Sequence, residues 1–263
     1  MKLYISDNNL VYLKHETLDN YFYSKLCFSD DNFENASIIT INEADCFEYN
    51  KSLNEFCFPY DVTEAQRCFL LRLVVDAVQI KRGNLPLHAS AVTNGTETYI
   101  ICAGSGKGKT YISEEVCRKF HSFDIIGDDH VILSTDYIQG NKKRRIRNMD
   151  LKETGYQNNI GFTQMTDVSF ICFDYSASGN TISYVEDSKL KNCFLLVSAF
   201  KYLNEVFVHN GLEYSACNLI ESDVNELYEK IVLKYLNNKK AVYIQGTQQY
   251  AIDYISNQIG KGE

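Results

Sequence analysis

The chain has 263 residues, of which 45% are hydrophobic and 23% are charged, and its formal net charge is −8. The length suits one large domain with at most a small extension, and the modest charge excludes an intrinsically disordered chain. The negative balance argues against general binding to nucleic acid or to an anionic membrane, because both would be repelled.

The nine cysteines are odd in number, irregularly spaced and without a Cys-x-x-Cys pair, as expected of reduced thiols rather than a disulfide framework. The opening residues do not have the pattern of a secretory signal, and no apolar run is long enough to span a bilayer. We therefore expect a cytoplasmic protein without a membrane partner.

Residues 1–60 alternate short apolar runs with clusters of Asn, Asp and Ser. The β-prone runs lie at 3–5, 11–13, 21–23 and 38–41. The sequence therefore predicts a small β-rich N-terminal module over 1–60, followed by the main domain over 61–263.

The clearest helix is predicted over 61–83. Its apolar stripe has helical spacing and consists of Val62, Ala65, Phe69, Leu73, Ala77 and Ile80. Asp61 is placed to cap the start, with Glu64 completing a capping box, and Gly83 is placed to end the helix. The predicted solvent-exposed face carries Arg67, Arg72, Asp76, Lys81 and Arg82. We expect this helix to serve packing alone.

A strand is predicted at 87–92, and Asn94-Gly95 predicts a hairpin turn into a second strand at 99–102. His88 lies in the first of these strands. From its spacing alone, such a histidine is usually a hydrogen-bonded core residue without a catalytic role.

A glycine-rich loop lies between the strand at 99–102 and a helix predicted at 111–120. Its sequence is Ala103-Gly104-Ser105-Gly106-Lys107-Gly108-Lys109-Thr110. The pattern is typical of a phosphate-binding loop (P-loop), whose glycines let successive backbone N–H groups curl around a phosphate. Lys109 is placed to reach the β- and γ-phosphates, and the Thr110 hydroxyl to bind Mg²⁺. The simpler interpretation is a glycine-rich turn between two elements.

Asp128-Asp129 follows an apolar run that begins at Phe123, downstream of the glycine-rich loop. A carboxylate at such a strand end commonly binds Mg²⁺ in nucleotide-dependent enzymes. Because adjacent residues of a continuing strand point to opposite faces, one acid can serve the metal while the other accepts the proton of an attacking hydroxyl. The alternative is an Asp-Asp turn that only connects two strands.

The remaining elements give an α/β chain with several antiparallel strands. Further strands are predicted at 168–174, 181–185 and 241–245, and further helices at 188–203, 222–236 and 248–259.

A basic run at 142–147 stands out against the acidic background. Within it Arg145 and Arg147 flank Ile146 and share a strand face, so they are our first candidates for phosphate contacts at the mouth of the site. The alternative is a solvated turn.

Three motifs together resemble the kinase domain of bacterial HPr serine kinase/phosphorylase. They are Leu87-His88-Ala89-Ser90-Ala91-Val92, then Ile101-Cys102 with the glycine-rich loop, and then Ile126-Gly127-Asp128-Asp129-His130-Val131. The chain is more similar still to shortened relatives of that enzyme, which include kinases of ribosomal peptides such as lasso peptides. The resemblance spans about 60–135, with weaker support from the strand Ala241-Val242-Tyr243.

The resemblance implies a P-loop kinase core related to ATP-type phosphoenolpyruvate carboxykinase, a mixed sheet with flanking helices. His88 falls on the family's strand histidine, which supports the catalytic carboxylate. Asp128 and Asp129 fall on its paired acids, and we favour Asp129 as the base and Asp128 for the metal. The chain lacks the longer enzyme's Glu-x-Arg-Gly-Leu-Gly segment and its large N-terminal domain. HPr as substrate, the reverse reaction and hexameric assembly therefore do not carry over.

The expected function is that of a kinase dependent on ATP (or another nucleoside triphosphate) and Mg²⁺. Its expected partners are the nucleotide and a peptide or small-protein acceptor with a Ser or Thr hydroxyl, such as the precursor of a ribosomally made peptide product. Self-association is compatible with this sequence. Two alternatives stay open: a kinase with a small-molecule acceptor, and a nucleotide-binding regulator without transferase activity.

Overall fold

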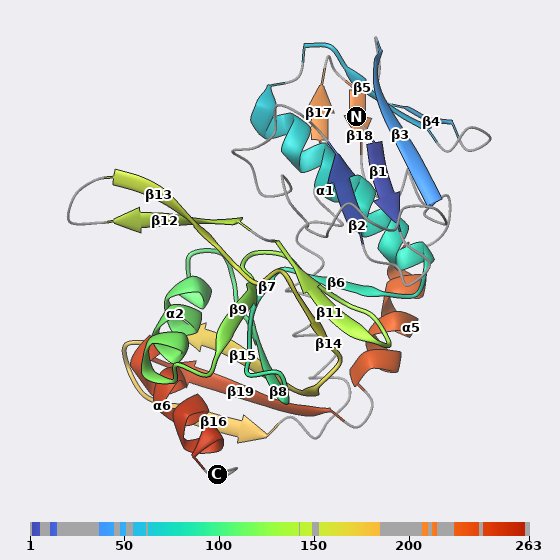
Figure 1. Cartoon of the computed structure of the whole chain (residues 1–263). Coiled ribbons are helices and arrows are strands. Elements are labelled where there is room, and N and C mark those ends of the chain that lie inside the picture. Colours follow the sequence, from blue (N-terminus) through green and yellow to red (C-terminus); the bar gives the residue numbers. More distant parts are fainter. Residues whose placement is uncertain are drawn as a thin grey trace.

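A computed structural model describes residues 2–5, 11–14, 37–44, 48–50, 55–61, 63–141, 143–148, 153–184, 207–209, 212–214, 224–236 and 239–260. Within them the chain is α/β, as the sequence predicts, with four helices and a central mixed sheet of six strands (Figure 1). The helix predicted at 188–203 and the strand predicted at 21–23 lie outside the described residues.

The central sheet has the strand order β16-β19-β15-β8-β7-β9. Three parallel strands form its middle: β8 (Glu97–Cys102), β15 (Asp167–Tyr175) and β19 (Lys240–Gly246). The other strands are antiparallel to their neighbours: β7 (Ala89–Thr93), β9 (Asp124–Gly127) and β16 (Thr181–Tyr184). Both faces of the middle strands are buried, which explains why the sequences of these strands are nearly continuous apolar runs.

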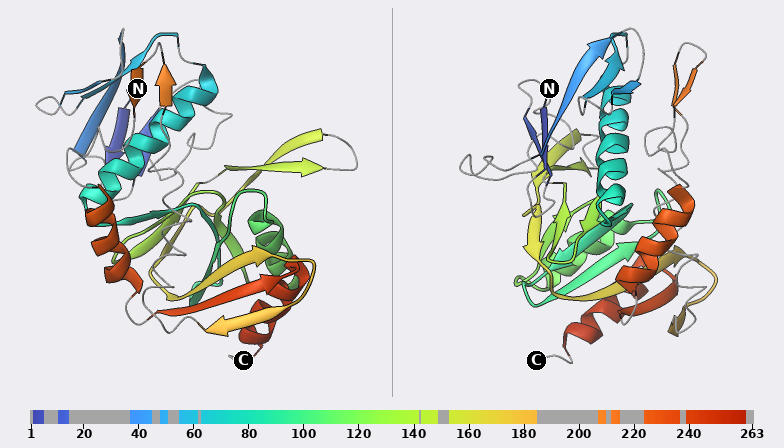
Figure 2. Two further views of the ribbon diagram at one scale, coloured as in Figure 1. Left: turned by 180° about the vertical axis from the view of Figure 1, so that it is seen from behind. Right: turned by 90° about the vertical axis from the view of Figure 1, so that its right-hand side faces the viewer.

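Alternate residues of these strands serve two different cores. Ile101 and Ile171 belong to the core that includes the buried residues of α2 (Lys109–Lys119) and α6 (Gln248–Ile259). Ile100 of β8 belongs to the core on the opposite face. The two helices therefore cover one face of the central sheet, as the left view of Figure 2 shows.

The second core contains an antiparallel sheet of order β14-β11-β10-β6 and two helices. The strands are β6 (Leu85–Leu87), β10 (Val131–Leu133), β11 (Tyr137–Gly140) and β14 (Phe162–Gln164). The helices are α1 (Glu64–Lys81) and α5 (Val224–Leu236). Because β6 and β7 follow each other but belong to different sheets, the chain crosses between the layers at His88.

The N-terminal strands form a separate sheet of order β2-β1-β3-β5-β4. Its strands are β1 (Lys2–Ile5), β2 (Val11–Lys14), β3 (Ser37–Ala44), β4 (Glu48–Asn50) and β5 (Glu55–Pro59). Three of the four strands expected there are therefore confirmed. Phe56 and Phe58 of β5 belong to the same core cluster as Leu73 and Ile80 of α1, so apolar contacts join this sheet to the rest of the chain.

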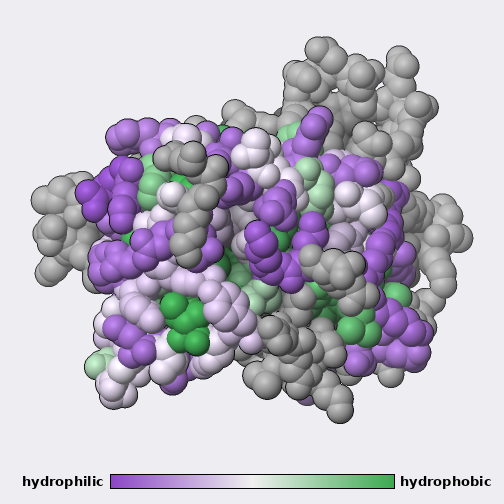
Figure 3. Space-filling model, turned by 90° about the horizontal axis from the view of Figure 1, so that it is seen from below, coloured by the Kyte–Doolittle hydropathy of each residue, from purple (hydrophilic) through white to green (hydrophobic). Residues whose placement is uncertain are grey.

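Two short antiparallel pairs lie outside these sheets. They are β12 (Lys143–Asn148) with β13 (Glu153–Asn158), and β17 (Phe207–His209) with β18 (Leu212–Tyr214). On the face drawn in Figure 3, hydrophilic residues predominate and the hydrophobic areas are small and separate. Among the described residues, no helix has the length and apolar character needed to cross a membrane.

Several predicted helix and strand boundaries differ from those in the structure. Helix α1 begins at Glu64, three residues later than predicted, so Asp61 lies in the preceding turn, whereas Gly83 follows the helix in a left-handed conformation as predicted. The strand predicted at 87–92 is divided at His88. The apolar run from Phe123 is also divided, because β9 ends at Gly127 and β10 begins three residues after Asp128.

Candidate active site

The segments singled out in the sequence meet at one edge of the central sheet. Strand β8 ends there at Cys102 and leads into the glycine-rich loop. The antiparallel strand β7 begins there, with Ala89 opposite Cys102, so His88 lies at the same edge. Strand β9 ends there too, with Gly127 opposite Ala91, and leads into Asp128. Topology thus brings together residues that are up to 41 positions apart in the chain.

The glycine-rich loop adopts conformations that require glycine. Gly106 and Gly108 have φ angles of 74° and 102°, in the left-handed region that disfavours other residues. Gly108 also packs closely, since a Cβ there would lie 2.9 Å from Cγ of Gln248 on α6. Gly104, Ser105 and Gly106 are exposed, and the half-buried Lys107 pairs with Asp174 at 3.5 Å. The backbone of the loop is therefore accessible from solvent.

Lys109 occupies the first turn of α2, because the helix begins two residues earlier than predicted. The residue is only 4% exposed, and its Nζ donates to the carbonyls of Ala103 (3.0 Å) and Gly104 (3.3 Å) and to Nε2 of His88 (2.8 Å). An ammonium group has no acceptor, so Nε2 of His88 accepts and Nδ1 of the neutral ring carries the proton.

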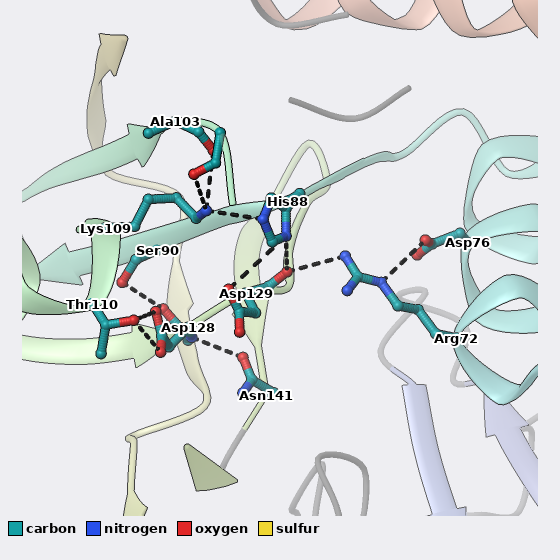
Figure 4. Close-up of polar contacts among 12 residues, drawn as sticks. Arg72, Asp76, His88, Ser90, Ala103, Lys109, Thr110, Asp128, Asp129 and Asn141 are labelled. Carbon is teal, nitrogen blue, oxygen red and sulfur yellow. Dashed lines mark hydrogen bonds and ion pairs between the residues drawn. The ribbon is translucent and has the colours of Figure 1, made fainter. Parts of the chain in front are cut away.

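The Nδ1–H group of His88 forms a hydrogen bond with the backbone of Asp129. Its Nδ1 donates to the Asp129 carbonyl at 3.1 Å, whereas the nearer carboxylate oxygen is 4.0 Å away. The resemblance implies support of the carboxylate itself. Figure 4 shows His88 approaching both groups: the hydrogen bond is to the main chain, because the strand ends before the acid pair and turns the carbonyl toward the ring, and the carboxylate forms the longer ion pair with Nδ1.

Asp128 is held beside Thr110. The Thr110 hydroxyl lies 3.0 and 2.8 Å from the two carboxylate oxygens, and Asp128 is only 3% exposed. The Asp128 N–H donates to Oδ1 of Asn141 at 2.8 Å, and Nδ2 of Asn159 donates to the Asn141 carbonyl at 2.8 Å. These buried contacts fix the direction of the Asp128 side chain.

The Thr110 and Asp128 oxygens suit a small hard cation. Neighbouring ligands of an octahedral Mg²⁺ with bonds of 2.0–2.1 Å lie about 2.9 Å apart, which is close to the separation of these oxygens. No group of three His, Cys, Asp or Glu side chains among the described residues could hold a metal ion. Water and phosphate oxygens usually complete the coordination of Mg²⁺ that is bound with a nucleotide.

Asp129 differs sharply from its neighbour. Its side chain is 43% exposed, and it is the one non-glycine residue with positive φ (67°) in the described part of the chain. Its carbonyl accepts hydrogen bonds from His88 and from Arg72, the latter at 3.0 Å. The sequence predicts that the two acids differ because they alternate along a strand. They differ instead because the turn buries Asp128 and exposes Asp129.

Arg72, Asp76 and His130 also lie at this site, although none of them was a predicted site residue. The prediction of a solvated face is wrong for Arg72 and Asp76, because both pack toward the turn after β9. The Nε2 of His130 donates to Asp76 at 2.7 Å, and burial lowers the pKa of His130 although the Asp76 carboxylate opposes the shift. A signal was available, since Arg72 and Asp76 are complementary charges one helical turn apart.

Arg145 and Arg147 stay predictions as phosphate contacts, because their side chains lie outside the described residues. The backbone of β12 that carries them is described and pairs with β13 in register. This two-stranded ribbon leaves the site directly after Asn141 and returns to it at Asn159.

Gly127 stands at a tight crossing between layers. A Cβ added there would lie 2.5 Å from the Cα of Gly140 and 2.8 Å from the His130 carbonyl. We expect Gly127→Ala to lower the free energy of unfolding by about 1–3 kcal/mol, because β9 and β11 must separate. Urea unfolding checks this, with Gly179→Ala as the control, since a Cβ at Gly179 meets nothing within 4 Å. If the two variants had the same free energy of unfolding, the close approach of β9 and β11 at Gly127 would be contradicted.

No protein-family model matches the chain, and a search of curated proteins finds no match to it. The function of this α/β protein is therefore argued from the residues of the site.

Proposed function

We propose that the protein is a kinase that transfers the γ-phosphoryl group of ATP, or of another nucleoside triphosphate, to a Ser or Thr hydroxyl of a peptide or small protein. One observation carries the proposal. An accessible glycine-rich loop leads directly into Lys109 and Thr110, Asp128 lies within 3.0 Å of the Thr110 hydroxyl, and the exposed Asp129 follows it. A phosphate cradle, a pair of magnesium ligands and a solvent-accessible carboxylate are the parts that phosphoryl transfer requires.

The loop and α2 would bind the phosphates. Backbone N–H groups at the start of a helix have no partner within it, and they favour an anion. Lys109 now donates to two loop carbonyls and to His88, and these contacts hold its ammonium group next to the loop. On nucleotide binding it would exchange one or more of them for phosphate oxygens. Thr110 and Asp128 would hold Mg²⁺, which when bound neutralises charge on the β- and γ-phosphates.

Asp129 would accept the proton of the attacking hydroxyl. Its carboxylate is exposed enough for an acceptor to approach, while its backbone is fixed by two donors. An acid that is accessible but held in one direction suits general base catalysis, which requires hydrogen-bond contact with the hydroxyl. Asp128 is buried against Thr110 and suits the metal role better.

The ribbon of β12 and β13 favours a peptide over a small molecule as acceptor. It begins after Asn141, whose side chain binds the Asp128 N–H, and it projects from the central sheet (Figure 1). The two strands contain four basic residues and one acidic residue, although the whole chain carries a charge of −8. A strand edge can bind an extended peptide through backbone hydrogen bonds, and the basic residues would attract acidic positions in that peptide.

The test is phosphate transfer to defined acceptors. The purified protein is incubated with ATP, Mg²⁺ and peptides that contain one Ser or Thr among acidic or basic residues, and mass spectrometry follows the products. We expect a mass increase of one phosphate, greater for acidic peptides and abolished by EDTA. Phosphorylation of an amino acid, sugar or nucleoside alone would establish the small-molecule alternative. Nucleotide binding without transfer to any of these acceptors would instead favour a regulator.

A further inference from the structure

We infer that Arg72 of α1 is a positioning residue that holds the backbone of Asp129 and so aims its carboxylate. The inference rests on the proposed function, because it gives Asp129 the role of proton acceptor. The contacts behind it are with the main chain of Asp129 and with two side chains outside the predicted site.

Asp129 adopts a conformation that must be held in place. A left-handed backbone is unfavourable for a residue with a Cβ, although less so for Asp than for most, and it persists where the surroundings enforce it. The Asp129 carbonyl accepts from Nδ1 of His88 at 3.1 Å and from the Arg72 guanidinium at 3.0 Å. Hydrogen bonds from a charged donor are the stronger kind. Arg72 therefore supplies the charged member of the pair that fixes this turn.

Arg72 is itself held by a closed ring of contacts. Its Nε lies 3.7 Å from one oxygen of Asp76, one helical turn further along α1. The other Asp76 oxygen accepts from Nε2 of His130 at 2.7 Å. His130 directly follows Asp129, so the ring returns to the same turn. Figure 4 shows Arg72 reaching from α1 to Asp129, with Asp76 behind it.

The position of Arg72 indicates that it supports the Asp129 turn and does not contact substrate. Both Asp76 and His130 are buried, and the Arg72 side chain is only 13% exposed. The guanidinium contacts the Asp129 carbonyl and the Asp76 carboxylate. Since a misplacement of about 1 Å at a reacting group can cost about 10²-fold in rate, loss of this contact affects turnover more than nucleotide binding.

The experiment compares Arg72→Met and Arg72→Lys with Arg118→Met, which removes an exposed arginine on α2 that pairs with Glu115. Hydrogen exchange by mass spectrometry, without nucleotide, reports on the backbone around Asp129. We expect faster exchange over 127–131 in Arg72→Met but not in Arg118→Met. In transfer assays we expect kcat to fall about 10- to 100-fold in Arg72→Met with the KM for ATP within about twofold. Arg72→Lys should recover part of the loss.

Each outcome has a distinct meaning. If the unaltered protein transfers no phosphate, the proposed function fails, and exchange still decides whether Arg72 holds the turn. If transfer occurs and Arg72→Met keeps both its kcat and its slow exchange, the inference is overturned. A fall in ATP affinity that parallels the fall in kcat would also overturn it, because Arg72 would then act on the nucleotide. Should Arg72→Met not fold, the test passes to Arg72→Lys, for which we expect a smaller fall in kcat and a smaller rise in exchange over 127–131; a Lys variant that matches the unaltered protein in both would overturn the inference.

Discussion

Replacing Asp129 by asparagine is expected to lower the rate of phosphoryl transfer by about 10²–10⁴-fold while nucleotide affinity stays unchanged. Asparagine has nearly the same shape, and it tolerates the left-handed backbone that Asp129 adopts. The bonds from His88 and Arg72 to the carbonyl are therefore retained. What the variant loses is the carboxylate that we propose as the proton acceptor. Single-turnover transfer and a nucleotide titration measure the two effects separately.

Asp124→Asn provides the matched control, because Asp124 is an exposed acid on β9, the strand that leads into the site. It should transfer phosphate at the unaltered rate. Full activity of Asp129→Asn would remove Asp129 from the mechanism. If Asp128→Asn alone lost the chemical step while Asp129→Asn lost the dependence on Mg²⁺, the two acids would have exchanged the roles proposed here.

Replacing Lys109 by methionine is expected to lower transfer by about 10²–10³-fold, the usual effect of removing one charged or hydrogen-bonding group from a developing anion. Lys109 is buried, and methionine can occupy much of the same space without the charge. Affinity for ATP should fall more than affinity for AMP, because the ammonium group faces the β- and γ-phosphates in the proposed complex. Calorimetric titration with both nucleotides measures this difference.

Lys119→Met is the control, since Lys119 lies at the exposed end of the same helix, over the ring of Phe120. It should bind both nucleotides as the unaltered protein does. A Lys109→Met protein with unaltered ATP affinity and transfer rate would contradict the phosphate-binding loop. Equal losses for ATP and AMP would show that the lysine supports the fold rather than the phosphates.

Elements with strong local signals were predicted well from the sequence. Helix α6 was predicted at 248–259 and spans Gln248–Ile259, where Thr247 caps its first turn by accepting from the Tyr250 N–H. The glycine-rich loop between strand and helix was predicted for the same reason. Its residues are consecutive, and its left-handed turns at Gly106 and Gly108 need glycine whatever packs around them.

The prediction failed where distant residues decide the environment. Arg72 and Asp76 were expected on a solvated face because they lie off the apolar stripe of α1. They are withdrawn from solvent because each has a partner there, in the Asp129 carbonyl and in His130. Periodicity counts apolar residues, and it does not register polar ones that burial tolerates once they are hydrogen-bonded.

The sequence by itself determined the elements of the sheet's edge and the chemical groups available there: Lys109, Thr110 and two adjacent acids. The tertiary structure decided the surroundings of each group. It ends β9 at Gly127, buries Asp128 against Thr110, and holds Asp129 exposed between His88 and Arg72. The physical reason is that spacing along the chain fixes local conformation, whereas burial and hydrogen-bond partners arise from segments that only the fold brings together.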